Sequence, residues 1–355
     1  MKLLHITATH LNPIGGIPVV LKNLTDAQNR IEGFEAKVLS VSADVNLIDS
    51  PYFSFLGNQS FSDYLDVYKP DVVIFHSHYY LKYLKLYPFC LKRNIPYFIE
   101  PHGSFGKNSL KKSRWKKVVA NYIVFRRFMK KAKGFVFLNQ SEQSKSRFRT
   151  PNDIIIPNGI DLSHNTFVEC DENKILSFYY IGRYDINHKG LDCLFDALDI
   201  LEKKNKSIQF DFYGEGTLDA ESYLKKRSEK YKNIHVRFNS PIYGQNQDKE
   251  LNQKGIMVLI SRYEGFPMTI LEAWKYGNPC LVTDGTNVAE ETVKNKLGWR
   301  TEFSPESIAN TMEYIVEDYQ ANKEEYLKKC KEYVFKNYTW DKIAKMSFSQ
   351  LNKYI

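Results

Sequence analysis

Short apolar, β-branched runs alternate with longer segments of helical periodicity along the chain. In the first half, the runs that predict buried strands are KLLHITA, AKVLSVS, DVVIFHSH, PYFIEPHG, GFVFLN and DIIIPNG. Between them, PVVLKNLTDAQNR and the stretch 109–132 have the apolar spacing of helices. Strands that alternate with helices in this way predict a parallel sheet covered by helices.

The alternation starts again after the polar segment CDENKI. The second half offers LSFYYIGR, IQFDFYGEG, IHVRF, IMVLIS and PCLVTD as strands, and LDCLFDALDILEKKN, DAESYLKKRSEKY and MTILEAWKYG as helices. Two amphipathic helices, 305–332 and 340–355, close the chain. Because 355 residues exceed one typical core, we predict two Rossmann-like, doubly wound α/β domains that join near residues 160–172.

The composition favours a globular cytoplasmic protein. No apolar run approaches the roughly 18 residues of a membrane span, and the apolar part of MKLLHITATHLNP is too short for a signal peptide. The five cysteines are widely spaced and include no C-x-x-C pair, so they indicate neither a disulfide framework nor a zinc site.

The excess positive charge belongs to the first half. Residues 1–165 hold 23 Lys and Arg against 12 Asp and Glu, whereas the rest of the chain holds 27 and 29. The segment 107–133 contains eleven cations, no acid, and the aromatic residues Trp115, Tyr122, Phe125 and Phe128. It fits a well-solvated helix pair, a patch for anionic lipid or a phosphate-bearing acceptor, or a nucleic-acid surface. We expect contact with an anionic membrane or acceptor, and no nucleic-acid partner.

Two cations stand on the turn that follows the first strand of the second half. In GRYDINHKG, Arg183 and Lys189 are six residues apart. Neighbouring cations repel one another unless an anion lies between them, and a planar guanidinium beside a point charge suits a diphosphate.

Two glutamates flank a predicted helix start in the segment SRYEGFPMTILEAWKYGNPCLVTD. Proline suits the first helical position, so the helix should begin near Pro267 and end at about Tyr276. Glu264 would then precede the helix, and Glu272 would lie a turn and a half inside it.

The free amides at this helix start would point between the two carboxylates. The amides of Met268 and Thr269 form a ready anion site. Carboxylates beside an anion repel it unless they bind hydroxyls instead. A ligand with phosphate in its middle and sugar hydroxyls at both ends, a nucleotide-sugar, would satisfy the arrangement.

Further candidates stand at other strand ends. Gly15 and Gly16 follow the first strand and suit a loop that approaches a phosphate, although they do not form the G-x-G-x-x-G pattern of dinucleotide binding. His102 follows the strand PYFIE and precedes Gly103. His76 and His78 have no third metal ligand in view, so we expect them to be structural.

Five segments together resemble one enzyme family. PIGGIP, EPHGSF, IPNGID, GRYDINHKG and EGFPMTILE occur in the order found in retaining nucleotide-sugar glycosyltransferases of family 4, which have the GT-B fold. The resemblance covers essentially the whole chain. It implies an acceptor-binding domain over 1–165, a donor-binding domain over 166–338, a C-terminal helix over 339–355 that packs back toward the first domain, and an active site in an interdomain cleft.

The resemblance also implies roles for individual residues. Arg183 and Lys189 would hold the donor diphosphate, Glu272 the ribose, and Glu264 the transferred sugar. His102 would bind that sugar near the reacting carbon. The remaining donor contacts would come from Gly15, Gly16, Gly214, Pro241, Ile242, Phe266, Met268 and Thr269.

The expected reaction is transfer of a hexosyl or N-acetylhexosaminyl unit, with retention, from a UDP-sugar to a sugar, lipid-linked or polypeptide-linked glycan. No D-x-D motif occurs, so we expect no metal and no cofactor. The Lys- and Asn-rich composition suggests a bacterial enzyme of surface-glycan synthesis, acting in the cytoplasm or at the inner face of the membrane. A GT-B sugar-nucleotide epimerase and a non-catalytic GT-B partner subunit are the alternatives.

Overall fold

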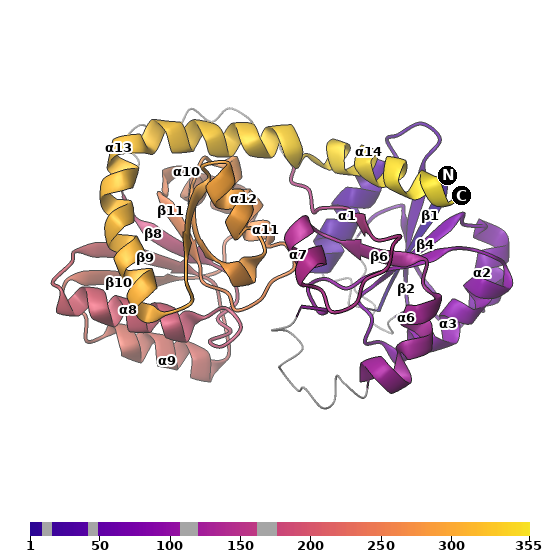
Figure 1. The fold of residues 1–355 in the computed structure, drawn as a ribbon, viewed down its shortest axis with the longest axis horizontal. Coiled ribbons are helices and arrows are strands. Elements are labelled where there is room, and N and C mark those ends of the chain that lie inside the picture. Colours follow the sequence, from indigo (N-terminus) through magenta and orange to yellow (C-terminus); the bar gives the residue numbers. More distant parts are fainter. Residues whose placement is uncertain (9–15, 42–48, 107–119, 162–175) are drawn as a thin grey trace. The chain divides into compact units, whose positions relative to one another are not determined.

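The computed structural model describes residues 1–8, 16–41, 49–106, 120–161 and 176–355. These residues form two compact units (Figure 1). Unit 1 comprises Met1–Asp161 and Tyr338–Ile355, and unit 2 comprises Leu162–Asn337.

The described part of unit 1 contains a seven-stranded parallel sheet in the order β3-β2-β1-β4-β5-β6-β7. Its central strands are buried because both faces of the sheet are covered. The strands are β1 (Lys2–Thr7), β2 (Glu35–Ser40), β3 (Phe53–Phe55), β4 (Val72–His76), β5 (Tyr97–Glu100), β6 (Gly134–Phe137) and β7 (Ile154–Ile155). The helices are α1 (Gly16–Gln28), α2 (Phe61–Tyr68), α3 (Leu81–Lys92), α6 (Arg126–Lys131), α7 (Gln140–Lys145) and α14 (Trp340–Leu351), with a π-helical turn at Ala120–Val124.

Helix α14 returns to unit 1 from the end of the chain and packs on α1 (Figure 1). The aromatic rings of Phe34 and Phe348 lie 5.2 Å apart. The ring of Trp340 covers Gly159, where an added Cβ would lie 2.6 Å from that ring. A larger residue at position 159 would therefore push the helix away.

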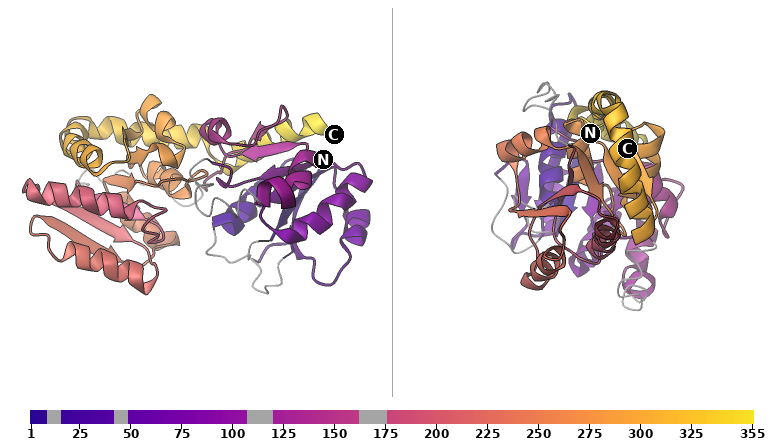
Figure 2. Two further views of the ribbon diagram at one scale, coloured as in Figure 1. Left: turned by 60° about the horizontal axis from the view of Figure 1, so that its bottom comes forward. Right: turned by 90° about the vertical axis from the view of Figure 1, so that its left-hand side faces the viewer.

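The described part of unit 2 contains a six-stranded parallel sheet in the order β10-β9-β8-β11-β12-β13. Helices flank this sheet in the views of Figure 2. The strands are β8 (Phe178–Ile181), β9 (Ile208–Tyr213), β10 (Ile234–Asn239), β11 (Ile256–Leu259), β12 (Cys280–Thr283) and β13 (Gly298–Thr301). The helices are α8 (Leu191–Lys203), α9 (Leu218–Ser228), α10 (Gly244–Gln253), α11 (Met268–Lys275), α12 (Ala289–Lys294) and α13 (Pro305–Asn337).

The structure confirms the prediction of two doubly wound parallel-sheet domains. Some individual elements differ from the sequence prediction. Helix α13 extends to Asn337, five residues beyond the predicted end, and α14 ends at Leu351 before a short 3₁₀ turn. The predicted helix over 109–132 lies partly outside the described residues, and its described part is a π-helical turn followed by α6.

Candidate functional site

Lys189 and Glu264 form a short ion pair in unit 2, beyond the carboxyl ends of β8 and β11. Lys189 Nζ lies 2.7 Å from Glu264 Oε1, and the two side chains are only 15% and 12% exposed. The Ser261 hydroxyl donates a hydrogen bond to the same carboxylate oxygen at 2.6 Å. These contacts hold the ammonium and the carboxylate in one fixed geometry.

Close backbone packing brings the two loops together. Gly190 has a φ of +68°, and an added Cβ there would lie 2.0 Å from the Ile260 carbonyl oxygen. A side chain at this position would displace Lys189 from the end of β11. The amide of Arg262 also donates to the His188 carbonyl at 3.0 Å, which links the same two loops.

The segment after β12 also holds the loop that carries Glu264. The Glu264 amide donates to the Gly285 carbonyl at 2.8 Å, and the Asn287 side-chain amide donates to the Glu264 carbonyl at 2.7 Å. His188 lies against this loop: its Nε2 is 2.7 Å from the Tyr263 carbonyl, and its ring stacks on the ring of Tyr263. Ser261, His188 and Asn287 were not predicted as site residues. His188 stands inside the motif GRYDINHKG and Ser261 opens the segment SRYEGFPMTILEAWKYGNPCLVTD, whereas Asn287 lies outside both.

Arg183 lies at the edge of an open hollow of about 700 Å³ between the loops that follow β8 and β9. Its side chain is exposed. An added Cβ on Gly214 would lie 2.0 Å from the Gly182 carbonyl, so this glycine lets the two loops touch. The lining residues are Arg183, Tyr184, Asp185, Ile186, Asn187, Glu215, Gly216, Thr217, Asp219, Ala220 and Tyr223.

Helix α11 starts where the sequence predicted, directly after Pro267. The side chain of Phe266, directly before this proline, is buried and therefore closed to a ligand. Met268 and Thr269 open the helix, and both are partly exposed. The start of the helix therefore presents backbone amides beside the loop that carries Glu264.

Glu272 lies inside α11, and its surroundings favour the neutral carboxyl. Burial raises the pKa of Glu272, although a hydrogen bond from Gln247 and the charge of Lys275 oppose the shift. Gln247 belongs to α10, and Pro241 and Ile242 lie partly buried in the loop before that helix. Glu272 and this loop are therefore connected through α10.

In unit 1, His102 stands directly beyond β5 with a positive φ of 48°. Its side chain is 14% exposed. The next residue, Gly103, is held by Glu142, which accepts a hydrogen bond from the Gly103 amide at 2.6 Å. Burial raises the pKa of Glu142 to about 7 and lowers the pKa of His102 to about 4.

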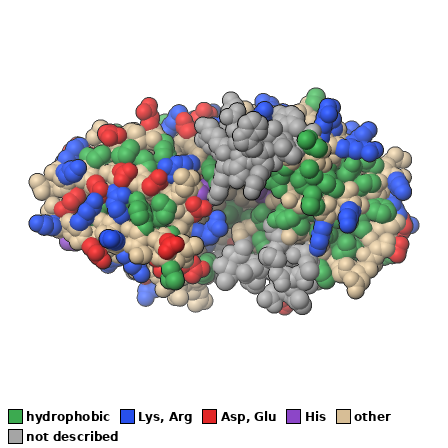
Figure 3. All heavy atoms as spheres, turned by 90° about the horizontal axis from the view of Figure 1, so that it is seen from below, with side chains coloured by type: hydrophobic (Ala, Val, Ile, Leu, Met, Phe, Trp, Pro, Cys, Tyr) green, Lys and Arg blue, Asp and Glu red, His purple; other side chains and the backbone are tan. Residues whose placement is uncertain are grey.

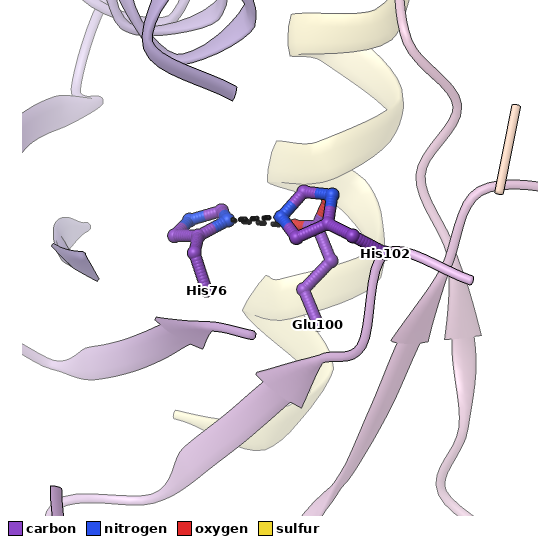
Figure 4. Close-up of side chains that lie close together, drawn as sticks. All are labelled: His76, Glu100 and His102. Carbon is purple, nitrogen blue, oxygen red and sulfur yellow. Dashed lines mark hydrogen bonds and ion pairs between the residues drawn. The ribbon is translucent and has the colours of Figure 1, made fainter. Parts of the chain in front are cut away.

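Both ring nitrogens of His102 face buried partners (Figure 4). The Nε2 atom lies 3.1 Å from His76 Nδ1, and the Nδ1 atom lies 3.4 Å from Glu100 Oε1. Glu100 Oε2 is also 3.3 Å from His76 Nδ1. His76, which the sequence analysis treated as structural, thus contacts His102, because β4 pairs with β5 in the register His76↔Glu100.

His76, Glu100 and His102 offer ligand atoms within 4.8 Å of one another, as a divalent metal would require. Glu100 and His102 are distant from His76 in sequence, so a third ligand was not predicted there. His76 Nδ1 and His102 Nε2 are at hydrogen-bonding distance, so a proton lies between them. A metal bound by both nitrogens would have to displace that proton. His78 lies outside this cluster, and its Nδ1 is 3.2 Å from the Ser104 hydroxyl.

The glycine pair near the N-terminus is described only in part. Gly15 lies outside the described residues, and Gly16 is the first residue of α1. An added Cβ on Gly16 would meet no described heavy atom within 4 Å. Packing within the described protein therefore does not require glycine at position 16.

The basic segment 107–133 is also described only in part, because 107–119 and the side chain of Tyr122 lie outside the described residues. Phe125 and Phe128 are buried in the core of unit 1, whereas Ile123 is 73% exposed. In Figure 3, the visible face of unit 1 displays mainly hydrophobic and basic side chains, and unit 2 displays basic and acidic ones interspersed. Within the described ranges, no helix is both long enough and apolar enough to cross a membrane.

Two family models match the chain in succession. "Glycosyltransferase Family 4" matches residues 14–164, and "Glycosyl transferases group 1" matches residues 169–337. An uncharacterized 41.2 kDa protein in the cps region of Klebsiella pneumoniae is 24% identical over 332 residues, covering 85% of this chain and 86% of that protein. The lipopolysaccharide 1,6-galactosyltransferase of Salmonella typhimurium is 26% identical over 159 residues, which are 44% of each chain.

Solved structures resemble the full length of the chain. Sucrose-phosphate synthase from Thermosynechococcus elongatus has a TM-score of 0.75 at 15% identity, covering 99% of this chain and 98% of that one. Anabaena HepE in complex with UDP and glucose has a TM-score of 0.70 at 15% identity, covering 99% of both chains. With its two parallel-sheet units and two successive glycosyltransferase matches, the chain is a glycosyltransferase with the GT-B fold.

Proposed function

We propose that this glycosyltransferase moves a hexosyl or N-acetylhexosaminyl unit from a UDP-sugar to a glycan or lipid-linked acceptor, with retention of the anomeric configuration. The observation that carries the proposal is the Lys189–Glu264 pair, which Ser261 braces beside the start of α11. The pair holds a cation and a carboxylate together in unit 2, and a carboxylate can accept hydrogen bonds from the hydroxyls of a sugar. A relative that is a 1,6-galactosyltransferase and a neighbour solved with UDP and glucose support this donor class.

In this proposal the leaving diphosphate is stabilised by fixed protein charges. Arg183 and Lys189 bind its oxygens, and the amides of Met268 and Thr269 add the positive end of a helix. The bond from the anomeric carbon to the diphosphate breaks, and the acceptor oxygen bonds to that carbon on the same face. The departing diphosphate takes the proton of the acceptor hydroxyl.

The other donor contacts follow from the chemistry of the residues. Glu264 binds hydroxyls of the transferred sugar and Glu272 binds the ribose, since carboxylates accept hydrogen bonds from hydroxyls. Gly214, Pro241 and Ile242 contact the base. Gly15 and Gly16 approach the donor phosphates, while His102 contacts the transferred sugar.

We assign acceptor binding to unit 1 and attraction of an anionic, lipid-linked acceptor to the segment 107–133, at the cytoplasmic face of the membrane. The exposed cations of α6 and the exposed Ile123 support a peripheral contact. The test is sedimentation with anionic vesicles. Replacing Lys111, Lys112, Lys116 and Lys117 by Glu should abolish binding, and unchanged binding would favour a water-soluble acceptor.

The function is tested with a panel of nucleotide-sugars, first by thermal shift and then by mass spectrometry with candidate acceptors. Transfer from a UDP-hexose to an acceptor, with the donor's anomeric configuration kept in the product, is the expected result. Conversion of the donor to another sugar-nucleotide without an acceptor would instead indicate an epimerase. Donor binding with neither outcome would indicate a non-catalytic subunit.

A further inference from the structure

A continuous chain of hydrogen-bonding contacts leads from His102 to the C-terminal helix through buried side chains. His102 Nε2 lies 3.1 Å from His76 Nδ1, and His76 Nε2 lies 2.8 Å from His5 Nδ1. His5 Nε2 lies 3.1 Å from Gln28 Oε1, and Gln28 Nε2 lies 3.1 Å from Ser347 Oγ. This hydrogen-bonded series thus leads from the loop after β5 to β4, β1, α1 and α14.

Ser347 on α14, the last member of this hydrogen-bonded series, fixes the direction of the hydrogen bonds. The Ser347 hydroxyl donates its one proton to the Ala344 carbonyl at 2.7 Å, because a carbonyl can only accept. Ser347 Oγ therefore accepts from the Gln28 amide nitrogen, and this orients the Gln28 carbonyl oxygen toward His5. That oxygen also only accepts, so His5 carries its proton on Nε2.

The donors and acceptors of the three imidazole rings follow from this proton position. His5 and His76 are each 1% exposed, and burial lowers the pKa of His5 to about 4 and the pKa of His76 well below its ordinary value. A neutral ring has one proton, so His5 Nδ1 accepts from His76 Nε2. His76 Nδ1 then accepts in turn, and His102, also neutral, donates from Nε2.

We propose that Gln28 and Ser347 are positioning residues that hold His102 in its Nε2–H tautomer, so that its Nδ1 accepts a hydrogen bond from a hydroxyl of the transferred sugar. The sugar contact rests on the proposed function, whereas the tautomer rests on the hydrogen bonds alone. Glu100 Oε1, 3.4 Å from Nδ1, is the internal partner of the same nitrogen. Burial raises the pKa of Glu100 well above its ordinary value, so its protonated carboxyl can donate to Nδ1 until a sugar hydroxyl takes its place as the donor.

The chemical consequence is a preference for hydroxyl donors. A neutral acceptor nitrogen binds an O–H group and offers nothing to a negatively charged substituent. A donor sugar that lacks the contacted hydroxyl should therefore lose His102 as a partner, and the wild-type enzyme should discriminate against it.

The test combines nuclear magnetic resonance with kinetics on the full-length protein. Long-range ¹H–¹⁵N spectra of histidine-labelled protein report which nitrogen of each ring carries the proton. Wild type should show the Nε2–H tautomer for His5, His76 and His102. Gln28→Met removes the acceptor that orients the chain, and Ser347→Ala is the milder second variant in case the first does not fold.

A matched control comes from the same helix. Gln350, also on α14, donates to the Ile155 carbonyl at 3.2 Å and takes no part in the chain. Gln28→Met and Ser347→Ala should give mixed His102 tautomers and lower kcat/KM for the donor roughly fivefold, the effect of one buried hydrogen bond. Gln350→Ala should keep the wild-type spectrum and kinetics.

Two outcomes would overturn the proposal: an Nδ1–H tautomer of His102 in wild type, or a wild-type His102 spectrum in Gln28→Met. Failure of the proposed function is recognised separately, because the wild-type enzyme would then transfer no sugar. The His102 tautomer in Gln28→Met would still decide whether Gln28 positions this ring.

Discussion

Lys189→Ala tests the proposed diphosphate contact. It removes one ammonium group, while the hydrogen bond from Ser261 still holds Glu264. Lys189 Nζ is 2.7 Å from Glu264 Oε1, and both side chains are largely shielded from water. Loss of a charge-assisted contact to a desolvated anion costs about 1.5–3 kcal/mol. That free energy corresponds to a loss of roughly 10- to 150-fold in kcat/KM for the donor.

The chain offers a matched control in the same unit. Lys254 Nζ lies 2.7 Å from Asp211 Oδ2, and those side chains are 11% and 0% exposed, so the pair is as short and as shielded as Lys189–Glu264. Lys254→Ala should lower the unfolding temperature because it leaves Asp211 with one cationic partner fewer. At a temperature where both variants are folded, it should retain donor kinetics near wild type.

The assay is initial-rate kinetics with varied donor and saturating acceptor, with circular dichroism to confirm folding. A folded Lys189→Ala enzyme with the kcat/KM of Lys254→Ala would refute the argument. The ion pair with Glu264 would then be structural, and the diphosphate would bind elsewhere.

Two further predictions concern carboxylates of unit 2. Glu272→Gln should mainly raise the donor KM, because ribose contacts change little between ground and transition states. Glu264→Gln should mainly lower kcat. Equal effects of the two variants in steady-state kinetics would contradict this division of roles. Burial alone would raise the pKa of Asp211, but hydrogen bonds from Arg237 and Lys254 lower it below its ordinary 3.8. The resulting stability is present above that value and is lost as the pH falls through the lower folded pKa, so Asp211→Asn should flatten the acid limb of a denaturation profile.

The sequence predicted the fold because each half repeats a strong local pattern. Apolar runs marked most of the buried strands, and the predicted limits near Pro267 and Tyr276 agree with those of α11. Elements with a weak apolar pattern, such as β3 and α10, were missed. The three residues of β3 lack a long apolar run, and α10, with the sequence GQNQDKELNQ, buries little apolar surface.

The contacts of the candidate site were predictable only in part. Arg183, Lys189 and Glu264 stood in motifs, but the Lys189–Glu264 ion pair depends on Gly190 packing against the end of β11. No sequence motif indicated the partners of His102. His5 and Gln28 reach it only through the parallel order of β1, β4 and β5, and periodicity within one element does not encode strand order.

The central claim is that unit 2 binds the donor diphosphate with Arg183, Lys189 and the start of α11. The most direct measurement is a calorimetric titration of UDP into the wild-type enzyme and into the Arg183→Ala, Lys189→Ala double variant, both in excess EDTA. We predict one UDP per chain in wild type and an affinity at least about a hundredfold weaker in the double variant, since two charge-assisted contacts are lost. Equal affinity in the two proteins, or wild-type binding only after a divalent metal is restored, would contradict the account.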